Sequence, residues 1–296
     1  KKSNLQKNPV GARTWAISLT AAALVIWAFF TYLFDKTPDA VQSWFQVWLP
    51  PSTINESLVW VICALGLNIV VGYAGLLDLG FVAFWAFGGY TAGWFMSSFF
   101  QQVNIHFGSM SAKVIPGIHL SFWVVMIIAA LIAGFFGIII GAPTLRLKSD
   151  YLALVTLGFG EIIPQVFVNG ENIGGFNLSN GTKGISPVDA IGVFGKRLGP
   201  FDLGWKFLIY FFLAACMVFV SLRIRGGRLG RAWLAIREDE LAASMMGVPL
   251  MRTKLTAYAV GAFSGGIGGA IYATHVNGIF AERFNFSISI ILLAMV

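Results

Sequence analysis

Residues 120–142, LSFWVVMIIAALIAGFFGIIIGA, carry no charged side chain, and this stretch indicates the fold class. A helix needs about 20 consecutive apolar residues to cross the hydrocarbon core of a bilayer, and this stretch is long enough. Further apolar runs lie on both sides of it, at 15–34, 58–73, 81–100, 151–168, 207–222, 256–274 and, shorter, at 287–296. We therefore expect an all-α polytopic membrane protein with about eight transmembrane helices, forming one membrane domain over residues 1–296.

The composition agrees with a membrane protein. Charged residues make up 11% of the chain, hydrophobic residues 57%, and the mean hydropathy is +0.77, whereas about 25% of the residues of a soluble domain are charged. The net charge of +7 lies mainly on loops, which favours a topology signal and contact with membrane lipid over nucleic-acid binding. Cys63 and Cys216 both fall in apolar runs, so we expect packing roles and neither a disulfide framework nor a metal cluster.

The basic residues also predict an orientation. The run at 15–34 follows several Lys and Arg residues and is longer than the core of a signal peptide, about 7–15 residues, so we expect a retained anchor. A cytoplasmic N-terminus puts most basic residues, including those of residues 223–254, on the cytoplasmic side, as the positive-inside rule requires. The run at 287–296 is about half a span long and predicts part of an eighth helix.

The connection between the second and third runs is short. Only residues 74–80 join them, and Gly72, Gly75 and Gly80 punctuate the region. A plain hairpin would explain this pattern. A broken, partly re-entrant helix would explain it equally, since irregular backbone at membrane depth survives where protein or water covers it.

Small residues recur at a spacing of four, which places each set on one face of a helix and lets helix backbones approach closely. We expect these positions to lie at helix-packing contacts, and an interface that slides is the sharper alternative. The positions are Gly89 and Gly93, Gly137 and Gly141, and the series Gly261, Gly265 and Gly269.

Two loops stand out. The outer loop at 169–205 contains GENIGGFNLSNGTKGISP, a turn-forming stretch that could receive a soluble partner, cover a pore mouth or simply connect two spans. The cytoplasmic segment at 226–254 carries an apolar stripe along one predicted amphipathic helix, formed by Leu234, Leu241, Met245 and Val248. Gly247 and Pro249 predict where that helix stops. It could lie on lipid, pack on the bundle or dock into a partner.

The stretch AIREDELAASMMGV at 235–248 resembles the coupling segment of ABC importer permeases. Four more stretches resemble the branched-chain amino acid permeases within that family and follow in the same order along the chain. They are GLNIVVGYAGLLDLGFVAFWAFGGYTA at 66–92, LRLKSDYLALVTLGFGEI at 145–162, the Gly- and Asn-rich outer loop, and KLTAYAVGAFSGGIGGAIYA at 254–273. The motif GLLDLG at 75–80 resembles one of the two sister permeases of the leucine, isoleucine and valine system more than it resembles the urea permeases of the same family.

The resemblance implies a function and a set of partners. It implies import of branched-chain amino acids across a bacterial inner membrane by alternating access, together with a sister permease, two ATPase subunits and an extracytoplasmic binding protein. The chain has no G-x-x-x-x-G-K-[ST] phosphate loop, so it is not expected to be an enzyme or to bind a cofactor, and ATP and Mg would be held by the partner subunits. The residues expected to couple it to the ATPases are Arg237, Glu238, Glu240, Ala242, Ala243 and Gly247.

Polar residues within the apolar runs are the candidates for lining the translocation path. Glu161 is the notable one, because a carboxylate at membrane depth is expensive and should face the bundle interior or water. A structural role beside Pro164 is the alternative. Asn68 and Asp78 are further candidates. An ion-coupled secondary transporter and a membrane-embedded enzyme remain as rival classes, although the spans lack the acid–His or acid–Lys sets of a proton relay.

Overall fold

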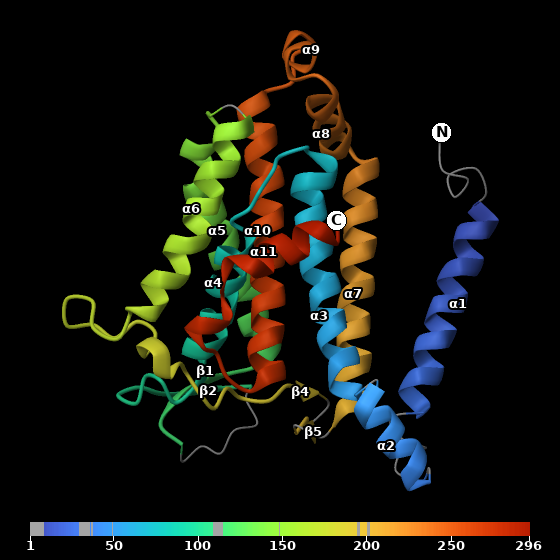
Figure 1. The fold of residues 1–296 in the computed structure, drawn as a ribbon, viewed down its shortest axis with the longest axis vertical. Coiled ribbons are helices and arrows are strands. Elements are labelled where there is room, and N and C mark those ends of the chain that lie inside the picture. The colour runs from blue at the N-terminus through green and yellow to red at the C-terminus, as the bar shows by residue number, and fades with distance from the viewer. Residues whose placement is uncertain are drawn as a thin grey trace.

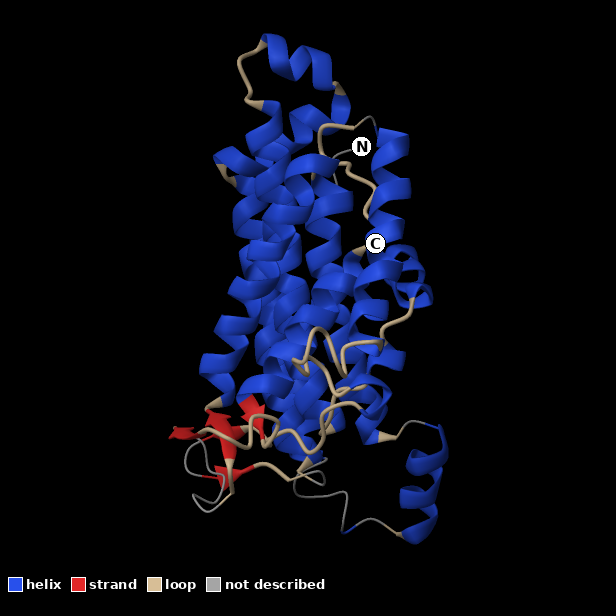
Figure 2. Cartoon of the chain, turned by 90° about the vertical axis from the view of Figure 1, so that its left-hand side faces the viewer, coloured by secondary structure: helices blue, strands red, loops and turns tan. Residues whose placement is uncertain are grey.

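The chain folds into a long bundle of helices, shown in Figure 1 and, from a second side, in Figure 2. The structure is a computed structural model that describes residues 9–29, 36, 38–48, 50–108, 115–147, 149–193, 196–199 and 202–296. Two short helices close one end of the bundle, and small sheets with long loops close the other. Helix α1 begins at the same end as the short helices.

Each of the eight predicted apolar runs contains a helix. These helices are α1 (Pro9–Ala28), α3 (Pro51–Asn68), α4 (Phe81–Phe95), α5 (Phe122–Thr144), α6 (Ser149–Val168), α7 (Leu203–Gly226), α10 (Leu250–Val276) and α11 (Phe286–Ala294). Within the described ranges, four helices are long and apolar enough to cross a membrane: Pro51–Tyr73, Phe122–Thr144, Tyr151–Val168 and Leu203–Gly226. The fold is therefore helical and suited to a membrane, while the number of eight crossings stays a prediction.

Two boundaries differ from the prediction. The third run was expected to stay helical to residue 100, but α4 ends at Phe95 because the chain then pairs as a strand, β1 (Met96–Ser97). The Ser97 hydroxyl donates to the Gly93 carbonyl at 2.5 Å and helps to close the helix end. In addition, α2 (Asp39–Trp48) was not predicted. Its exposed Trp44 and Trp48 are one helical turn apart, as expected of a helix resting at a membrane interface.

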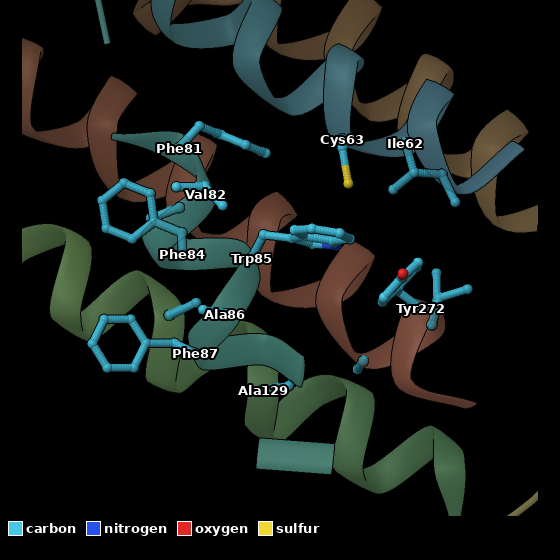
Figure 3. Packing of buried hydrophobic residues seen from close by; sticks show 14 of the residues in the cluster. Ile62, Cys63, Phe81, Val82, Phe84, Trp85, Ala86, Phe87, Ala129 and Tyr272 are labelled. Carbon is cyan, nitrogen blue, oxygen red and sulfur yellow. The ribbon is translucent and has the colours of Figure 1, made fainter. Parts of the chain in front are cut away.

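Helix α4 forms the centre of the bundle. Thirteen of its 15 residues are buried, and α10, α5 and α6 pack around it. Its Trp85, labelled with Tyr272 in Figure 3, contacts Tyr272 of α10 with ring centroids 4.7 Å apart. Trp85 also contacts Trp60 of α3, with centroids 5.3 Å apart. An aromatic core of this kind places much of the apolar packing energy in one helix.

The glycines singled out in the sequence lie at close contacts, those of α5 and α10 mostly against other helices and Gly89 and Gly93 against the loop residue Ile279. A Cβ atom at Gly269 of α10 would overlap the Trp85 carbonyl of α4, and one at Gly137 of α5 would lie 2.5 Å from the Cβ of Ala262. The other members of these sets also have neighbours from other segments within van der Waals distance of a built Cβ: Gly89, Gly93, Gly141, Gly261 and Gly265. These contacts fit tight packing; sliding is not tested by them.

The link between the second and third runs is irregular and reverses the direction of the chain. Helix α3 continues through a π turn, η4 (Ile69–Tyr73), and then gives way to a non-helical connector, residues 74–80, before α4 begins. The Leu79 N–H donates to the Thr156 hydroxyl at 3.1 Å, and the Val82 N–H donates to the Ser289 hydroxyl at 3.1 Å. Neighbouring helices thus satisfy the irregular backbone, which is the condition for such backbone inside a membrane.

The end of the bundle opposite the short helices carries two small sheets. Strands β1, β2 (Asn104–Phe107) and β3 (Gly117–Leu120) form a sheet in the order β1-β3-β2, while β4 (Gly192–Val193) pairs with β5 (Lys196–Arg197). His119 of β3 bonds Asp189 through Nδ1 and Oδ2, 2.6 Å apart, which fastens the sheet to the loop at 169–205. That loop also contains η5 (Gly181–Lys183), and η6 (Ala281–Arg283) precedes α11.

Candidate functional site

The segment at 226–254 forms a helical hairpin that projects from the bundle (Figures 1 and 2). It consists of α8 (Arg228–Glu238) and α9 (Glu240–Met245). Asp239 adopts an extended conformation between them and caps α9, because its carboxylate accepts from the N–H groups of Leu241 at 2.8 Å and Ala242 at 3.0 Å. The prediction of one continuous amphipathic helix was wrong for this reason. The predicted stop was right: α9 ends at Met245, and Gly247 has a φ of +82°.

Two contacts fasten this hairpin to α10. Trp233 of α8 is fully buried, and its indole N–H donates to the Thr253 carbonyl at 2.8 Å. Glu240 of α9 pairs with Lys254, whose side chain is 10% exposed, at 2.5 Å. Two links of this kind give the hairpin a defined position relative to the membrane helices.

The tip of the hairpin is apolar and uncovered. The side chains of Leu241, Met245 and Met246 are 71%, 80% and 85% exposed. Burying a Leu or Met side chain is worth about 1.5–3 kcal/mol, so three such side chains together on a small helix form an energetically favourable contact surface. We refer to these three residues as the apolar tip. Flexible methionines are frequent on surfaces that bind protein partners.

The predicted coupling residues fall into two groups. Glu238, Ala242 and Gly247 are exposed beside the apolar tip, where a partner could reach them. Arg237, Glu240 and Ala243 make contacts within the chain, and of these Arg237 and Glu240 are also exposed. Arg237 donates to the Gly72 carbonyl in the π turn, Glu240 binds Lys254, and Ala243 is 4% exposed. Their part in docking an ATPase stays a prediction.

The three path candidates lie in different environments. Asn68 is half-buried beside a groove of about 460 Å³, whose other lining residues include Trp60 and Ala64. Asp78 is 1% exposed, and its carboxylate accepts from the Gly80 N–H at 2.9 Å and bonds the Tyr258 hydroxyl. Asp78 therefore supports the connector 74–80.

Glu161 does not face the interior of this chain. It is exposed on α6, because the buried stripe of that helix runs through Thr156, Gly160, Pro164 and Phe167 and leaves Glu161 on its flank. The expected position in the bundle interior is thus not met within this chain, and a path role for Glu161 remains a prediction. A lipid-facing carboxylate is costly, so water or a partner subunit is expected to cover it.

Several residues of this region were not predicted from the sequence. Trp233 and Lys254 hold the hairpin, and Thr156 and Ser289 hold the connector, but each such role depends on contacts between distant segments. Lys206, near the start of α7, is a further ionisable residue within a span and is 5% exposed. Its position directly before the apolar run at 207–222 was the one signal that the sequence offered.

No metal centre emerges from the part of the chain that the structure describes. Within it, no three His, Cys, Asp or Glu side chains gather as possible metal ligands. The polar groups named above make contacts that support the fold and the projecting hairpin.

Several apolar helices of membrane length are the features of a polytopic α-helical membrane protein. The chain belongs to the family of permease components of branched-chain amino acid transport systems, whose model matches residues 51–296.

Three relatives show the extent of the similarity. The chain is 36% identical over 261 residues to the high-affinity branched-chain amino acid transport system permease protein LivM of Escherichia coli K12, and 35% identical over 261 residues to that of Salmonella typhimurium LT2. Each match covers 81% of this chain and 56% of the relative, so the chain spans a little over half their length. A probable branched-chain amino acid transport permease protein LivM of Methanocaldococcus jannaschii is 25% identical over 252 residues, covering 78% of this chain and 70% of the relative. No solved structure matches the chain.

Proposed function

We propose that this chain is a permease subunit of an ATP-driven importer that moves branched-chain amino acids across a bacterial inner membrane by alternating access. Membership of the permease family carries the proposal. The projecting hairpin supports it, since a permease without its own phosphate loop needs a surface on which separate ATPase subunits can act.

The proposed complex contains a sister permease, two ATPase subunits that hold ATP and Mg, and an extracytoplasmic binding protein. The chain itself is proposed to bind no cofactor. The apolar tip, with Glu238, Ala242 and Gly247 beside it, is the proposed ATPase contact. The N-terminus would then be cytoplasmic, because α1 begins at the same end of the bundle as this hairpin.

Alternating access follows from a two-state coupling. ATP would draw the ATPase subunits together and displace the hairpin, and packed helices have discrete arrangements rather than continuous ones. Substrate and ATP would then both shift the same equilibrium between the two arrangements of the helices. Coupling between two binding sites requires such a shared equilibrium.

The test is purification of this chain from its native membrane in mild detergent, with mass spectrometry of its partners and an ATPase assay. We expect two ATPase chains, a sister permease and hydrolysis stimulated by a binding protein loaded with leucine. A chain that purifies without ATPase subunits and drives uptake from an ion gradient would instead identify a secondary transporter.

A further inference from the structure

Arg237 makes an unexpected contact for a residue in a cytoplasmic coupling segment. Its Nη1 group donates a hydrogen bond to the carbonyl oxygen of Gly72, which lies in the π turn η4 at the end of α3. The aliphatic part of the side chain lies on the next glycine of the break, since a Cβ atom at Gly75 would be 2.7 Å from Arg237 Cγ. The end of α8 is therefore attached to the point where the membrane helix breaks.

The backbone at this point favours such an attachment. The N–H groups of Ala74, Gly75 and Leu76 bond the carbonyls of Ile69, Val71 and Val70, which closes the π turn before the chain leaves the helix. The Gly72 carbonyl then accepts from Arg237. A guanidinium on a helix-terminal carbonyl is favourable in charge as well as geometry. Gly75, at φ +69°, takes the left-handed conformation that this exit needs.

The far end of the connector 74–80 is held by other helices. Asp78 bonds Tyr258 of α10, and the N–H of Leu79 bonds Thr156 of α6. The chain then enters α4, the buried central helix. The connector is thus fixed at one end to the bundle and at the other to α8 through Arg237.

We propose that Arg237 is a positioning residue that transmits displacement of the hairpin to the connector 74–80 and so to α4. This assignment rests on the proposed function and differs from a docking role, in which Arg237 would contact the ATPase. Because Gly75 receives the Arg237 side chain, the two positions act as one unit. Changes at either should separate ATP hydrolysis from transport without releasing the ATPase subunits.

The decisive experiment measures amino acid uptake per ATP hydrolysed in the complete complex reconstituted in vesicles. We expect Arg237→Gln to lower this ratio by about fivefold or more, the usual range of a coupling interaction, with the ATPase subunits still bound. Gly75→Ala should give the same defect, because its Cβ would displace Arg237. The double variant should be no worse than either single one, which is the sign of a shared contact.

Matched controls separate this from general damage. Arg228→Gln removes an exposed arginine from the other end of α8 and should leave the ratio unchanged. Gly174→Ala imposes the same kind of backbone strain at φ +62°, with no neighbour within 4 Å, and should also leave it unchanged. A normal ratio in Arg237→Gln or Gly75→Ala overturns the proposal, and so does loss of the ATPase subunits from Arg237→Gln, which would identify a docking residue.

A second measurement needs no partner subunit, so its result tests the Arg237 contact independently of the proposed transport function. Amide hydrogen exchange of the purified chain in nanodiscs should become faster across residues 74–79 in Arg237→Gln and stay unchanged in Arg228→Gln. Equal exchange in the two variants overturns the link itself. If exchange responds but the wild-type chain neither binds an ATPase nor imports amino acids, the proposed function fails and the mechanical link stands.

Discussion

At the scale of single residues, glycine decides how closely helices can pack. Gly269→Ala would press a Cβ against the Trp85 carbonyl and within 2.6 Å of the Gly89 nitrogen, both in backbone that cannot easily move. We expect a loss of about 1–3 kcal/mol or more from this overpacking. Gly158→Ala is the matched control, since its Cβ would meet nothing within 4 Å and should gain helix propensity. Thermal unfolding in detergent compares them; equal midpoints would contradict this account of the α4–α10 contact.

Trp233 is the residue that positions the hairpin. Trp233→Phe keeps much of the packing but removes the indole donor, and since the Thr253 carbonyl keeps the Thr256 hydroxyl at 2.8 Å, we expect a loss of about 0.5–1.5 kcal/mol. Limited proteolysis should then cut faster within residues 238–249, while Trp44→Phe, at an exposed tryptophan, should change nothing there. An unchanged cleavage rate in Trp233→Phe would mean that the other contacts, Glu240 with Lys254 and Arg237 with the Gly72 carbonyl, suffice to hold the hairpin.

At the scale of elements, α9 depends on its cap. Six residues are too few for a helix to be stable without help from capping and packing. Asp239→Ala removes the acceptor for two N–H groups and should destabilise α9 by about 1 kcal/mol, whereas Asp239→Asn keeps an acceptor and should be close to wild type. Amide exchange of Leu241 and Ala242 reports the difference. Equal protection in the two variants would show that packing of Ala243 suffices.

A second prediction for α9 is that its apolar tip contacts the ATPase subunits. Leu241→Glu combined with Met245→Glu should abolish co-purification of ATPase subunits, because charged side chains cannot enter an apolar contact without a partner. The fold should survive, since both residues are largely exposed. Leu229→Glu, at an exposed leucine of α8, serves as the control. Retention of the ATPases by the double variant would place their contact elsewhere.

Sequence reasoning located the elements better than their ends and contacts. Long apolar runs predicted the helices because about 20 consecutive apolar residues are the length that an α-helix needs to cross a membrane. It missed the break at Asp239, since the apolar spacing fits one helix and the cap that interrupts it depends on local hydrogen bonds. It did not predict that the exposed Arg237 also bonds the Gly72 carbonyl, or that Glu161 lies outside the buried stripe of α6, because both depend on contacts between segments far apart in the sequence.

At the scale of the whole molecule, the two ends of the bundle differ in chemistry. The projecting hairpin and the basic last turn of α7, with Arg223 and Arg225, lie at one end. The sheets and the loop at 169–205 lie at the other. The loop also carries basic residues, but Lys183 is paired there with Glu171, whose hydrogen bond raises the pKa of Lys183. Positive charge near one set of helix ends predicts that this end faces the cytoplasm.

Single-cysteine labelling tests this orientation. In a Cys216→Ser background, which leaves the buried Cys63, a cysteine from Met245→Cys should react with a membrane-impermeant maleimide only after the cells are opened. A cysteine from Phe176→Cys, at the 56% exposed side chain of the outer loop, should react in intact spheroplasts. The reverse pattern would place the hairpin outside, where no ATP is available to drive it, and would refute both the orientation and the proposed coupling. Labelling of both positions from outside would indicate that the two ends share a side, and the count of membrane crossings would then have to change by one.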